Sequence, residues 1–152
     1  MKVTLEAITI DNFEALMDME LPPEQAAYLA SNAYSIAQAH YYPDYQARAI
    51  YCDGEPAGFA LYDISGDGEP GHYAIYRLMV DHRRQRQGIG RAAMGLLLDE
   101  IRGWEDARRI SICYKPDNAN AQRLYASLGF VEMGIDAREE MVAEIRLRAS
   151  TS

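Results

Sequence analysis

The stretch RLMVDHRRQRQGIGRAAM occupies residues 77–94 and joins a strand to a helix through a short turn. An apolar run ending at Val80 predicts the strand, an arginine-rich turn follows, and Gly88 and Gly90 stand before an alanine-rich helix. Glycine lets the backbone approach an anion closely, and a helix N-terminus presents unpaired N–H groups with a partial positive charge. The stretch therefore predicts a cradle for the pyrophosphate of a diphosphate-bearing cofactor.

Two common phosphate-binding motifs do not fit this stretch. A dinucleotide-binding fingerprint needs three glycines after the first strand and an acidic residue farther on, whereas this turn lies in mid-chain and lacks the third glycine. A P-loop needs Gly-Lys followed by Ser or Thr, which is also absent. Both nucleotide interpretations are therefore rejected.

Charge is distributed unevenly along the chain. The net charge is −8, from 15 basic and 23 acidic residues, which disfavours nucleic acid as a partner. Residues 82–91 nevertheless contain four arginines and no acid. A solvated basic loop would explain the arginines alone, but the glycines just before a helix favour an anion cradle.

Composition predicts one ordinary globular domain over residues 1–152, with 49% hydrophobic and 25% charged residues. No apolar run approaches the roughly 18 residues of a membrane span, and the N-terminus lacks a signal-peptide core, so a cytoplasmic location is expected. Cys52 and Cys113 lie in apolar strand-like runs and are interpreted as free core thiols. With only three histidines, no metal site is predicted.

Periodicity and turn signals predict the order β, α, α, β, β, β, α, β, α, β, β, a mixed α/β (α+β) sheet. The expected strands are 2–10, 47–52, 57–64, 72–81, 109–114, 130–133 and 141–147, and the expected helices are 12–18, 24–39, 88–102 and 118–128. Asp11 or Asn12 is expected to cap the first helix, Asp53-Gly54 to form a hairpin turn, and Gly129 to end the last helix.

Two of the helices show an apolar stripe with the helical period. In the second helix the stripe consists of Ala26, Ala30, Ala33, Tyr34 and Ala37. In the helix after the glycine turn it consists of Ile89, Ala93, Leu96, Leu97 and Ile101. Both stripes are expected to face the core.

Two blocks together resemble the GCN5-related N-acetyltransferase (GNAT) family. QRQGIG at residues 85–90 fits the family's Q/R-x-x-G-x-G/A motif, and NANAQRLYASLGF at residues 118–130 fits its N-x-x-A-x-x-L-Y-x-x-x-G-F block. The resemblance extends from about Val3 to Leu147. It implies a mixed sheet of about seven strands with about four helices, splayed between the fourth and fifth strands.

The resemblance also implies acetyl-coenzyme A as cofactor. Its pyrophosphate is expected on backbone amides of the glycine turn, and the strand at Leu78-Met79-Val80 is expected to pair with the pantetheine arm. Arg83 and Arg84 are expected near the outer phosphates. The alternative is that both are flexible surface arginines that bind no ligand. The residues expected to bind the cofactor are Leu78, Met79, Val80, Arg83, Arg84, Arg86, Gln87, Gly88, Ile89, Gly90, Arg91, Asn118 and Tyr125.

Tyr125 matches the tyrosine that serves as general acid in many relatives, and a tyrosine pKa of about 10 suits donation to a leaving thiolate. A packing tyrosine is the alternative. Asn118 matches the family asparagine that binds pantetheine, and a plain helix cap is compatible with that role. A backbone N–H of Met79 or Val80 is expected to polarise the thioester carbonyl.

The general base is not apparent. Some relatives have a glutamate on the strand before the glycine turn, but residues 73–77 here are Tyr-Ala-Ile-Tyr-Arg. A water chain that ends at a tyrosine or at an acid from another element is therefore expected. Tyr76 is a candidate for the acceptor site or for the core. His72 is a weaker base candidate and is expected at the surface, at the end of its strand.

The acceptor is expected to be a polyamine such as spermidine or spermine. The segments SNAYSIAQAHYYP at 31–43 and YRLMVD at 76–81 look like a bacterial spermine/spermidine (diamine) acetyltransferase branch. An acidic chain with 11 tyrosines suits a polycation. The candidate substrate residues are Glu20, Glu24, Tyr34 and Tyr76. The alternative interpretation of the two glutamates is that they are solvent-exposed residues at the start of a helix.

Other functions remain open at this point. The acceptor could be a protein N-terminus, a lysine, an aminoglycoside or an amino acid, and the chain could instead be a non-catalytic acetyl-coenzyme A sensor. A sensor would need the cradle but not Tyr125. Because family members often pair through their C-terminal strands, a homodimer is also expected.

Overall fold

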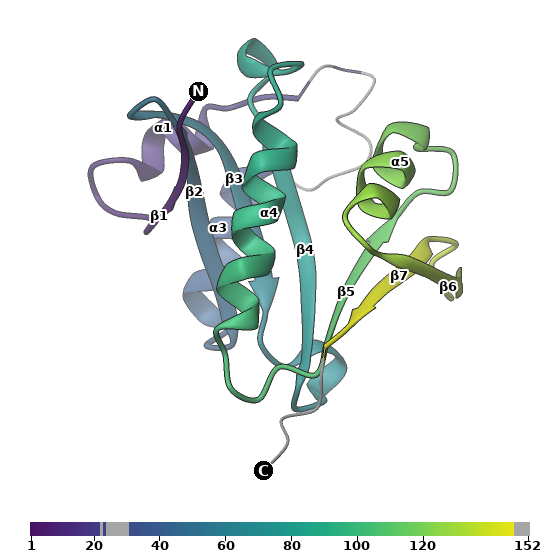
Figure 1. Ribbon diagram of the computed structural model, residues 1–152. Coiled ribbons are helices and arrows are strands. Elements are labelled where there is room, and N and C mark those ends of the chain that lie inside the picture. The colour runs from purple at the N-terminus through teal and green to yellow at the C-terminus, as the bar shows by residue number, and fades with distance from the viewer. Residues whose placement is uncertain (22, 24–30, 148–152) are drawn as a thin grey trace.

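A computed structural model describes residues 1–21, 23 and 31–147. Within these residues a seven-stranded sheet has the order β1-β2-β3-β4-β5-β7-β6 (Figure 1). β4 and β5 are parallel and all other neighbours are antiparallel. The strands are β1 (Val3–Glu6), β2 (Tyr45–Cys52), β3 (Glu55–Asp63), β4 (His72–Val80), β5 (Arg109–Tyr114), β6 (Val131–Ile135) and β7 (Met141–Arg146). The predicted mixed sheet is confirmed.

Four α-helices lie in the described part of the chain: α1 (Phe13–Met17), α3 (Asn32–Tyr41), α4 (Ile89–Arg102) and α5 (Ala119–Ser127). Two short 3-10 helices, Gly66–Gly68 and His82–Arg84, flank β4. No helix there is long and apolar enough to cross a membrane. The predicted order of strands and α-helices holds throughout the described residues. The predicted helix over 24–39 is not continuous, because α3 begins at Asn32 and the preceding Ser31 is extended and caps it through its side chain.

One face of the sheet packs against α4 (Figure 1). The buried side of α4 consists of Ile89, Ala93, Met94, Leu97, Leu98 and Ile101. Leu96, predicted to belong to this stripe, is only half-buried. The apolar stripe of an amphipathic helix is wider than one residue per turn, so more than one apolar position in each turn can face the sheet. In α4 the side chains of Met94 and Leu98 are buried instead of Leu96.

The opposite face packs against α1 and α3, and here the predicted stripe is wrong. Tyr34 and Ala37 are exposed, and the fully buried residues of α3 are Asn32 and Ser35. The polar Asn32 is buried because its amide donates a 2.7 Å hydrogen bond to the carbonyl of Leu16. The predicted residues Ala26 and Ala30 lie outside the described residues.

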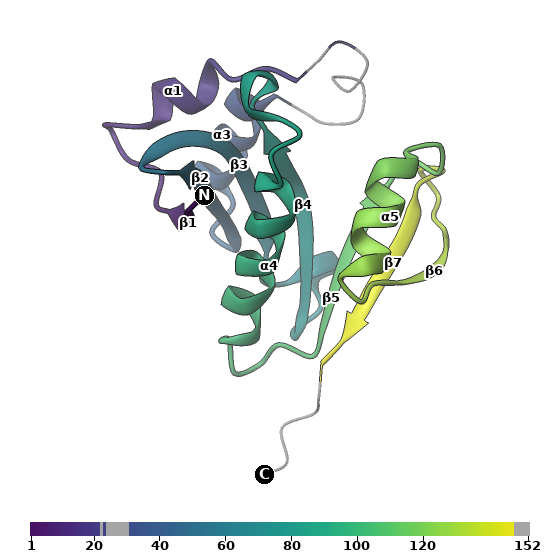
Figure 2. The same ribbon diagram turned by 45° about the horizontal axis from the view of Figure 1, so that its top comes forward.

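Strands β4 and β5 pair over only part of their length. The four residues from His72 to Ile75 pair with those from Arg109 to Ile112, after which the strands separate (Figure 2). A β-bulge lies at the same level: Ile75 is opposite Tyr62 and Arg77 is opposite Leu61, so Tyr76 is the extra residue. The predicted splay between the fourth and fifth strands is confirmed.

Local signals gave mixed results. Asp53 and Gly54 have φ values of 51° and 80°, as a two-residue hairpin turn requires, and Gly129 has a φ of 102° after α5. Asn12, however, does not cap α1 with its side chain. Its amide group instead bonds to the Thr9 N–H and the Ala7 carbonyl, which ends the first strand at Glu6 rather than at residue 10.

Candidate active site

A cavity of about 770 Å³ lies where β4 and β5 separate. One wall consists of the end of β4 and the glycine turn, and the other consists of the end of β5 and the start of α5. The cavity is lined by Leu21, Leu78, Met79, Val80, Arg84, Gln85, Arg86, Gly88, Ile89, Gly90, Cys113, Tyr114, Lys115, Asp117, Asn118, Ala119, Asn120, Ala121, Leu124 and Tyr125. The two sequence motifs therefore face each other across one space.

The glycine turn has the backbone geometry of an anion cradle. Arg86 and Gly88 have φ values of 65° and 82°, in the left-handed region. The first intrahelical bond of α4 joins the Ala92 N–H to the Gly88 carbonyl, so helix geometry leaves the preceding N–H groups without intrahelical acceptors. Such alternating backbone conformations before a helix N-terminus concentrate N–H groups toward one point.

Gly90 tests whether a ligand fits beside this turn. A Cβ at this position would meet only Val80 Cγ2, at 3.7 Å, which is an ordinary van der Waals distance. The fold itself would therefore accept a side chain here. Because Gly90 lines the cavity, the space that a side chain would fill is available to a phosphate group, and the turn fits a bound diphosphate.

The predicted cofactor residues of the turn fall into two groups. Arg84 lines the cavity and is held by Glu55 at 3.2 Å and by the Cys52 carbonyl at 3.3 Å. Three others do not line it. Arg83 is 78% exposed and pairs with Asp81, Gln87 is exposed, and Arg91 donates a 2.6 Å hydrogen bond to Ser127 Oγ, joining α4 to α5.

Asn118 lies on the second wall and caps α5. Its side-chain oxygen accepts a 3.2 Å hydrogen bond from the Ala121 N–H, which fixes the side chain at the lining of the cavity. Within the described residues its side-chain amide makes no other hydrogen bond. The geometry is therefore compatible with both roles, because the capping oxygen is engaged while the NH₂ group can reach a ligand.

Tyr125 projects from α5 to the same wall. Its ring packs against Tyr114 and Phe130, with centroid distances of 5.6 and 5.8 Å. Burial raises the pKa of Tyr125 to about 12. In the described part of the chain the hydroxyl has no hydrogen-bond partner. At neutral pH Tyr125 is therefore a protonated donor at the cavity.

Cys113 corrects the prediction of two core thiols. Cys52 is buried, but Cys113 is exposed and lines the cavity. Its sulfur lies 4.0 Å from Asp136 Oδ2, and partial desolvation in the gap raises the pKa of its thiol to about 11. The apolar run around Cys113 suggested a two-sided core strand, yet β4 has already separated from β5 at this level. The resemblance implied a gap near Cys113, but Tyr114 of β5 and Lys115 just after it were not predicted to line the cavity.

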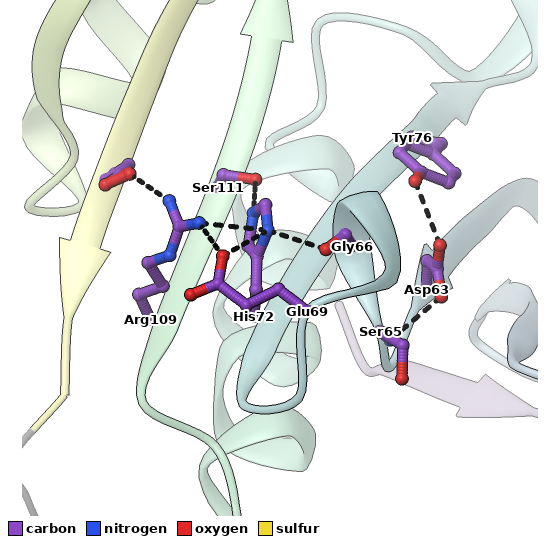
Figure 3. A network of polar contacts seen from close by, with 9 residues as sticks. Asp63, Ser65, Gly66, Glu69, His72, Tyr76, Arg109 and Ser111 are labelled. Atoms are coloured by element: carbon purple, nitrogen blue, oxygen red, sulfur yellow. Dashed lines mark hydrogen bonds and ion pairs between the residues drawn. The ribbon is translucent and has the colours of Figure 1, made fainter.

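His72 is buried rather than exposed at the end of its strand. Figure 3 shows its ring between Ser111 and Gly66, with Nε2 2.6 Å from Ser111 Oγ and Nδ1 3.0 Å from the Gly66 carbonyl. Arg109 bonds to Glu69 beside it. This network lies at the closed end of the splay, where His72 and Arg109 form the first β4–β5 pair, and His72 does not line the cavity.

The candidate acceptor residues lie outside the cavity lining. Tyr76 packs on Tyr45 and donates a 2.9 Å hydrogen bond to the buried Asp63 (Figure 3). Tyr34 is 59% exposed. Glu20 is exposed, and its backbone carbonyl accepts a hydrogen bond from the His82 N–H. Glu24 lies outside the described residues. Within the described chain no cluster of three metal-ligating side chains occurs.

The fold and the two-walled cavity define the class of protein. Residues 13–130 match the acetyltransferase (GNAT) family, and the chain belongs to this family.

Among individual relatives, the chain is similar to spermine/spermidine N(1)-acetyltransferase of Bacillus subtilis (strain 168). The two are 26% identical over 152 residues, which covers 95% of this chain and 100% of the relative. A probable spermine N(1)-acetyltransferase of Bacillus subtilis subsp. natto matches with the same identity and coverage.

Solved structures share the fold. Aminoglycoside acetyltransferase AAC(6')-Ib in complex with coenzyme A gives a TM-score of 0.79 at 16% identity, covering 95% of each chain. The ribosomal-protein-S18-alanine N-acetyltransferase of Escherichia coli gives 0.74 at 22% identity, covering 99% of this chain and 97% of the other. At these identities the likeness establishes the fold alone.

Proposed function

We propose that this acetyltransferase moves the acetyl group of acetyl-coenzyme A to a primary amine of a polyamine such as spermidine or spermine, with both substrates bound together. The observation that carries the proposal is the single cavity with a diphosphate cradle on one wall and Tyr125 on the other. An aminoglycoside acetyltransferase of the same fold is crystallised with coenzyme A.

The cofactor is held by the residues that surround the cavity. Acetyl-coenzyme A supplies the acetyl group as a thioester. The backbone N–H groups of Arg86 and of the start of α4 bind the pyrophosphate, and Arg84 adds positive charge. Main-chain groups of β4 that β5 leaves unpaired bind the pantetheine arm, together with the NH₂ group of Asn118. A backbone N–H of Met79 or Val80 polarises the carbonyl.

Tyr125 acts as the general acid. Its high pKa keeps the phenol protonated at neutral pH, so it can donate to the sulfur that leaves. A sensor that only bound the cofactor would have no use for a proton donor at this position. The residue therefore favours an enzyme over a non-catalytic acetyl-coenzyme A sensor.

Three observations favour a polyamine acceptor. The curated relatives are named for spermine and spermidine, and the chain carries a net charge of −8. Asp136 of the β6–β7 connection reaches Cys113 in the cavity wall. Carboxylates at this edge would hold the ammonium groups that are not acetylated. A cytoplasmic location and a homodimer that does not bind nucleic acid stay predictions.

The test is thiol release from acetyl-coenzyme A across a panel of amines. Spermidine, spermine and putrescine are compared with lysine, an N-terminal peptide, an amino acid and an aminoglycoside. Release that is fastest with the polyamines supports the proposal. Thiol release with another amine only would indicate that the acceptor is that amine and not a polyamine. Tight binding of coenzyme A with no thiol release for any amine would indicate a non-catalytic sensor.

A further inference from the structure

Strands β4 and β5 join the two halves of the sheet through a short seam, which is the stretch where they are paired. The seam consists of four residue pairs, from His72 with Arg109 to Ile75 with Ile112. β1–β4 lie on one side of it, and β5, β7 and β6 lie on the other. The cavity lies where the pairing ends, so the direction in which β5 leaves the seam sets how far apart the two cavity walls stand.

A buried contact between two polar side chains crosses the seam. His72 of β4 is 4% exposed and Ser111 of β5 is 6% exposed. His72 Nε2 lies 2.6 Å from Ser111 Oγ, and Nδ1 lies 3.0 Å from the carbonyl of Gly66 (Figure 3). A Cβ at Gly66 would lie 2.8 Å from His72 Nδ1, so the turn before β4 packs closely against the ring. The imidazole is therefore held on both sides and ties β5 to β4.

A charged contact crosses the seam beside the imidazole. Arg109 of β5 bonds to Glu69 of the turn before β4, and it also bonds to Glu144 of β7. Glu69 belongs to the half that contains β4, and Glu144 belongs to the half that contains β5. A network of hydrogen-bonded polar groups at low solvent exposure fixes the arrangement of its members more strictly than apolar packing does. The seam therefore has one preferred geometry.

The contact between His72 and Ser111 acts on the strand that lines the cavity. Cys113 follows Ser111 by two residues on β5, so the two side chains lie on the same face of the strand, about 7 Å apart. Cys113 and Tyr114 line the cavity, whereas His72 and Ser111 do not. The contact can therefore influence the site only through the position of β5.

The two parts of coenzyme A depend on this position to different degrees. In the proposed function the pyrophosphate lies on the glycine turn and on α4, which follow β4 in the same half of the sheet. The pantetheine arm lies in the gap and contacts both walls. A protein in which only a fraction of the molecules has the walls correctly placed binds its ligand with an affinity reduced by that fraction. Misplacement of β5 would therefore weaken binding of the arm and leave the pyrophosphate contacts intact.

We propose that His72 and Ser111 are positioning residues for the cofactor, because their contact holds β5 at the separation from β4 that fits the pantetheine arm. The pair touches neither coenzyme A nor the reacting atoms. Without the contact, water reaches the His72 ring and the seam loosens, so the arm binds only those molecules in which β5 has returned to its place. This inference rests on the proposed binding of acetyl-coenzyme A and does not depend on which amine is the acceptor.

The experiment compares two ligands by calorimetric titration. Coenzyme A carries the pantetheine arm, whereas 3′-phospho-ADP is the same molecule without the arm. Ser111→Ala removes the hydroxyl and leaves a buried ring nitrogen of His72 without its partner. We expect Kd for coenzyme A to rise about 5–30-fold and Kd for 3′-phospho-ADP to stay within about twofold of wild type. The ratio of the two affinities is the readout, because a general loss of structure would weaken both.

Three further variants separate this role from a structural one. Ser35→Ala is the matched control, because Ser35 is also buried but its hydroxyl has no hydrogen-bond partner among the described residues. It should leave both affinities within about twofold of wild type. Ser111→Thr keeps the hydroxyl and should keep the affinity ratio. His72→Phe keeps a ring but loses both polar contacts. It serves if Ser111→Ala does not fold, and it should raise Kd for coenzyme A selectively as well. The melting temperature checks the fold of each variant.

Two results would overturn the inference. Equal weakening of both ligands in Ser111→Ala would make the contact a support of the fold as a whole. An unchanged affinity for coenzyme A would mean that β5 is positioned without the contact. The proposed function fails in a different way. A wild-type protein that binds coenzyme A but releases no thiol with any amine would refute the transfer and leave the inference intact, whereas one that binds neither ligand would overturn both.

Discussion

At the scale of single residues, Tyr125 has surroundings that suit the proton donor we propose. A tyrosine buried for packing normally finds a partner for its hydroxyl. Tyr62 and Tyr114 do so, with Glu100 and Glu132, whereas the hydroxyl of Tyr125 has no partner in the described part of the chain. Its ring packs on Tyr114 and Phe130, so the unpaired oxygen is left for a ligand in the cavity.

Replacing Tyr125 with Phe should therefore lower kcat by about 10–1000-fold, the range of a lost general acid. Coenzyme A affinity should change little, since ring packing is kept. The measurement is steady-state thiol release alongside calorimetric titration with coenzyme A. Tyr41→Phe, at a site that is 79% exposed, is the matched control. Wild-type turnover in Tyr125→Phe would remove the residue from the mechanism.

Single residues were also the least predictable from sequence. The motif placed Asn118 and Tyr125 on the cavity wall because their spacing on α5 is fixed by the helix. Cys113 and His72 were misplaced, since local hydrophobicity cannot say which strand leaves its neighbour or which loop folds back over a histidine. The Gly66 carbonyl that meets His72 comes from a turn six residues earlier, and no local pattern indicates that contact.

At the scale of elements, the β4–turn–α4 unit carries most of the proposed cofactor binding. The turn needs left-handed backbone at Arg86 and Gly88, and the helix supplies the N–H groups. Gly90 belongs to the first turn of α4, where nothing in the protein requires a glycine. A glycine there is what the proposed close approach of a cofactor phosphate would require.

Gly90→Asp should weaken coenzyme A binding by about 10–100-fold, because a carboxylate would fill the cradle and repel the pyrophosphate. The fold should tolerate the change, since an acidic side chain in the first turn favours a helix by about 0.3–1 kcal/mol. Calorimetric titration with coenzyme A measures the effect.

Gly95→Asp is the matched control on the same helix, since a Cβ at Gly95 meets no atom within 4 Å. It adds the same charge away from the turn and should leave the affinity within about twofold of wild type. Equal affinity in Gly90→Asp and the wild-type protein would refute the cradle.

Elements with a strong local period were predictable, and those set by tertiary contacts were not. The strand 109–114 was predicted at its observed bounds, because apolar side chains at Ile110, Ile112 and Tyr114 recur with the period of two that is typical of a strand. The stripe of α3 was wrong, because Asn32 is buried by a hydrogen bond to another helix. The bulge at Tyr76, which changes the register between β3 and β4, has no sequence signature either.

At the scale of the whole molecule, one divergence between strands organises the site. α4 packs on β1–β4, whereas α5, β6 and β7 lie on the other side of the gap (Figure 2). The side chains that line the cavity therefore come from both halves. The exposed hydrogen bond between Arg91 of α4 and Ser127 of α5 joins the two halves at the surface. The contact between His72 of β4 and Ser111 of β5 joins them at the closed end of the gap. The family resemblance predicted this arrangement, which periodicity alone could not.

The buried tyrosines also make the stability of the whole molecule depend on alkaline pH. Burial raises the pKa of Tyr62 and of Tyr114 to about 12, whereas an unfolded tyrosine ionises near pH 10. Between these values the native state binds more protons than the unfolded state, so the free energy of unfolding must fall as pH rises. Below about pH 9 the same groups are neutral in both states and should have no effect.

Urea unfolding at pH 7, 8, 9, 10 and 11 should therefore show a constant free energy of unfolding up to about pH 9 and a decline above it, of at most about 1.4 kcal/mol per pH unit for each such tyrosine. Tyr62→Phe should be less stable at pH 8, because Glu100 and Trp104 lose their partner, yet its decline above pH 10 should be shallower. Tyr41→Phe should follow the wild-type curve. A flat curve through pH 11 would mean that the folded tyrosines ionise as readily as unfolded ones, and the same burial argument would then fail for the protonated phenol of Tyr125.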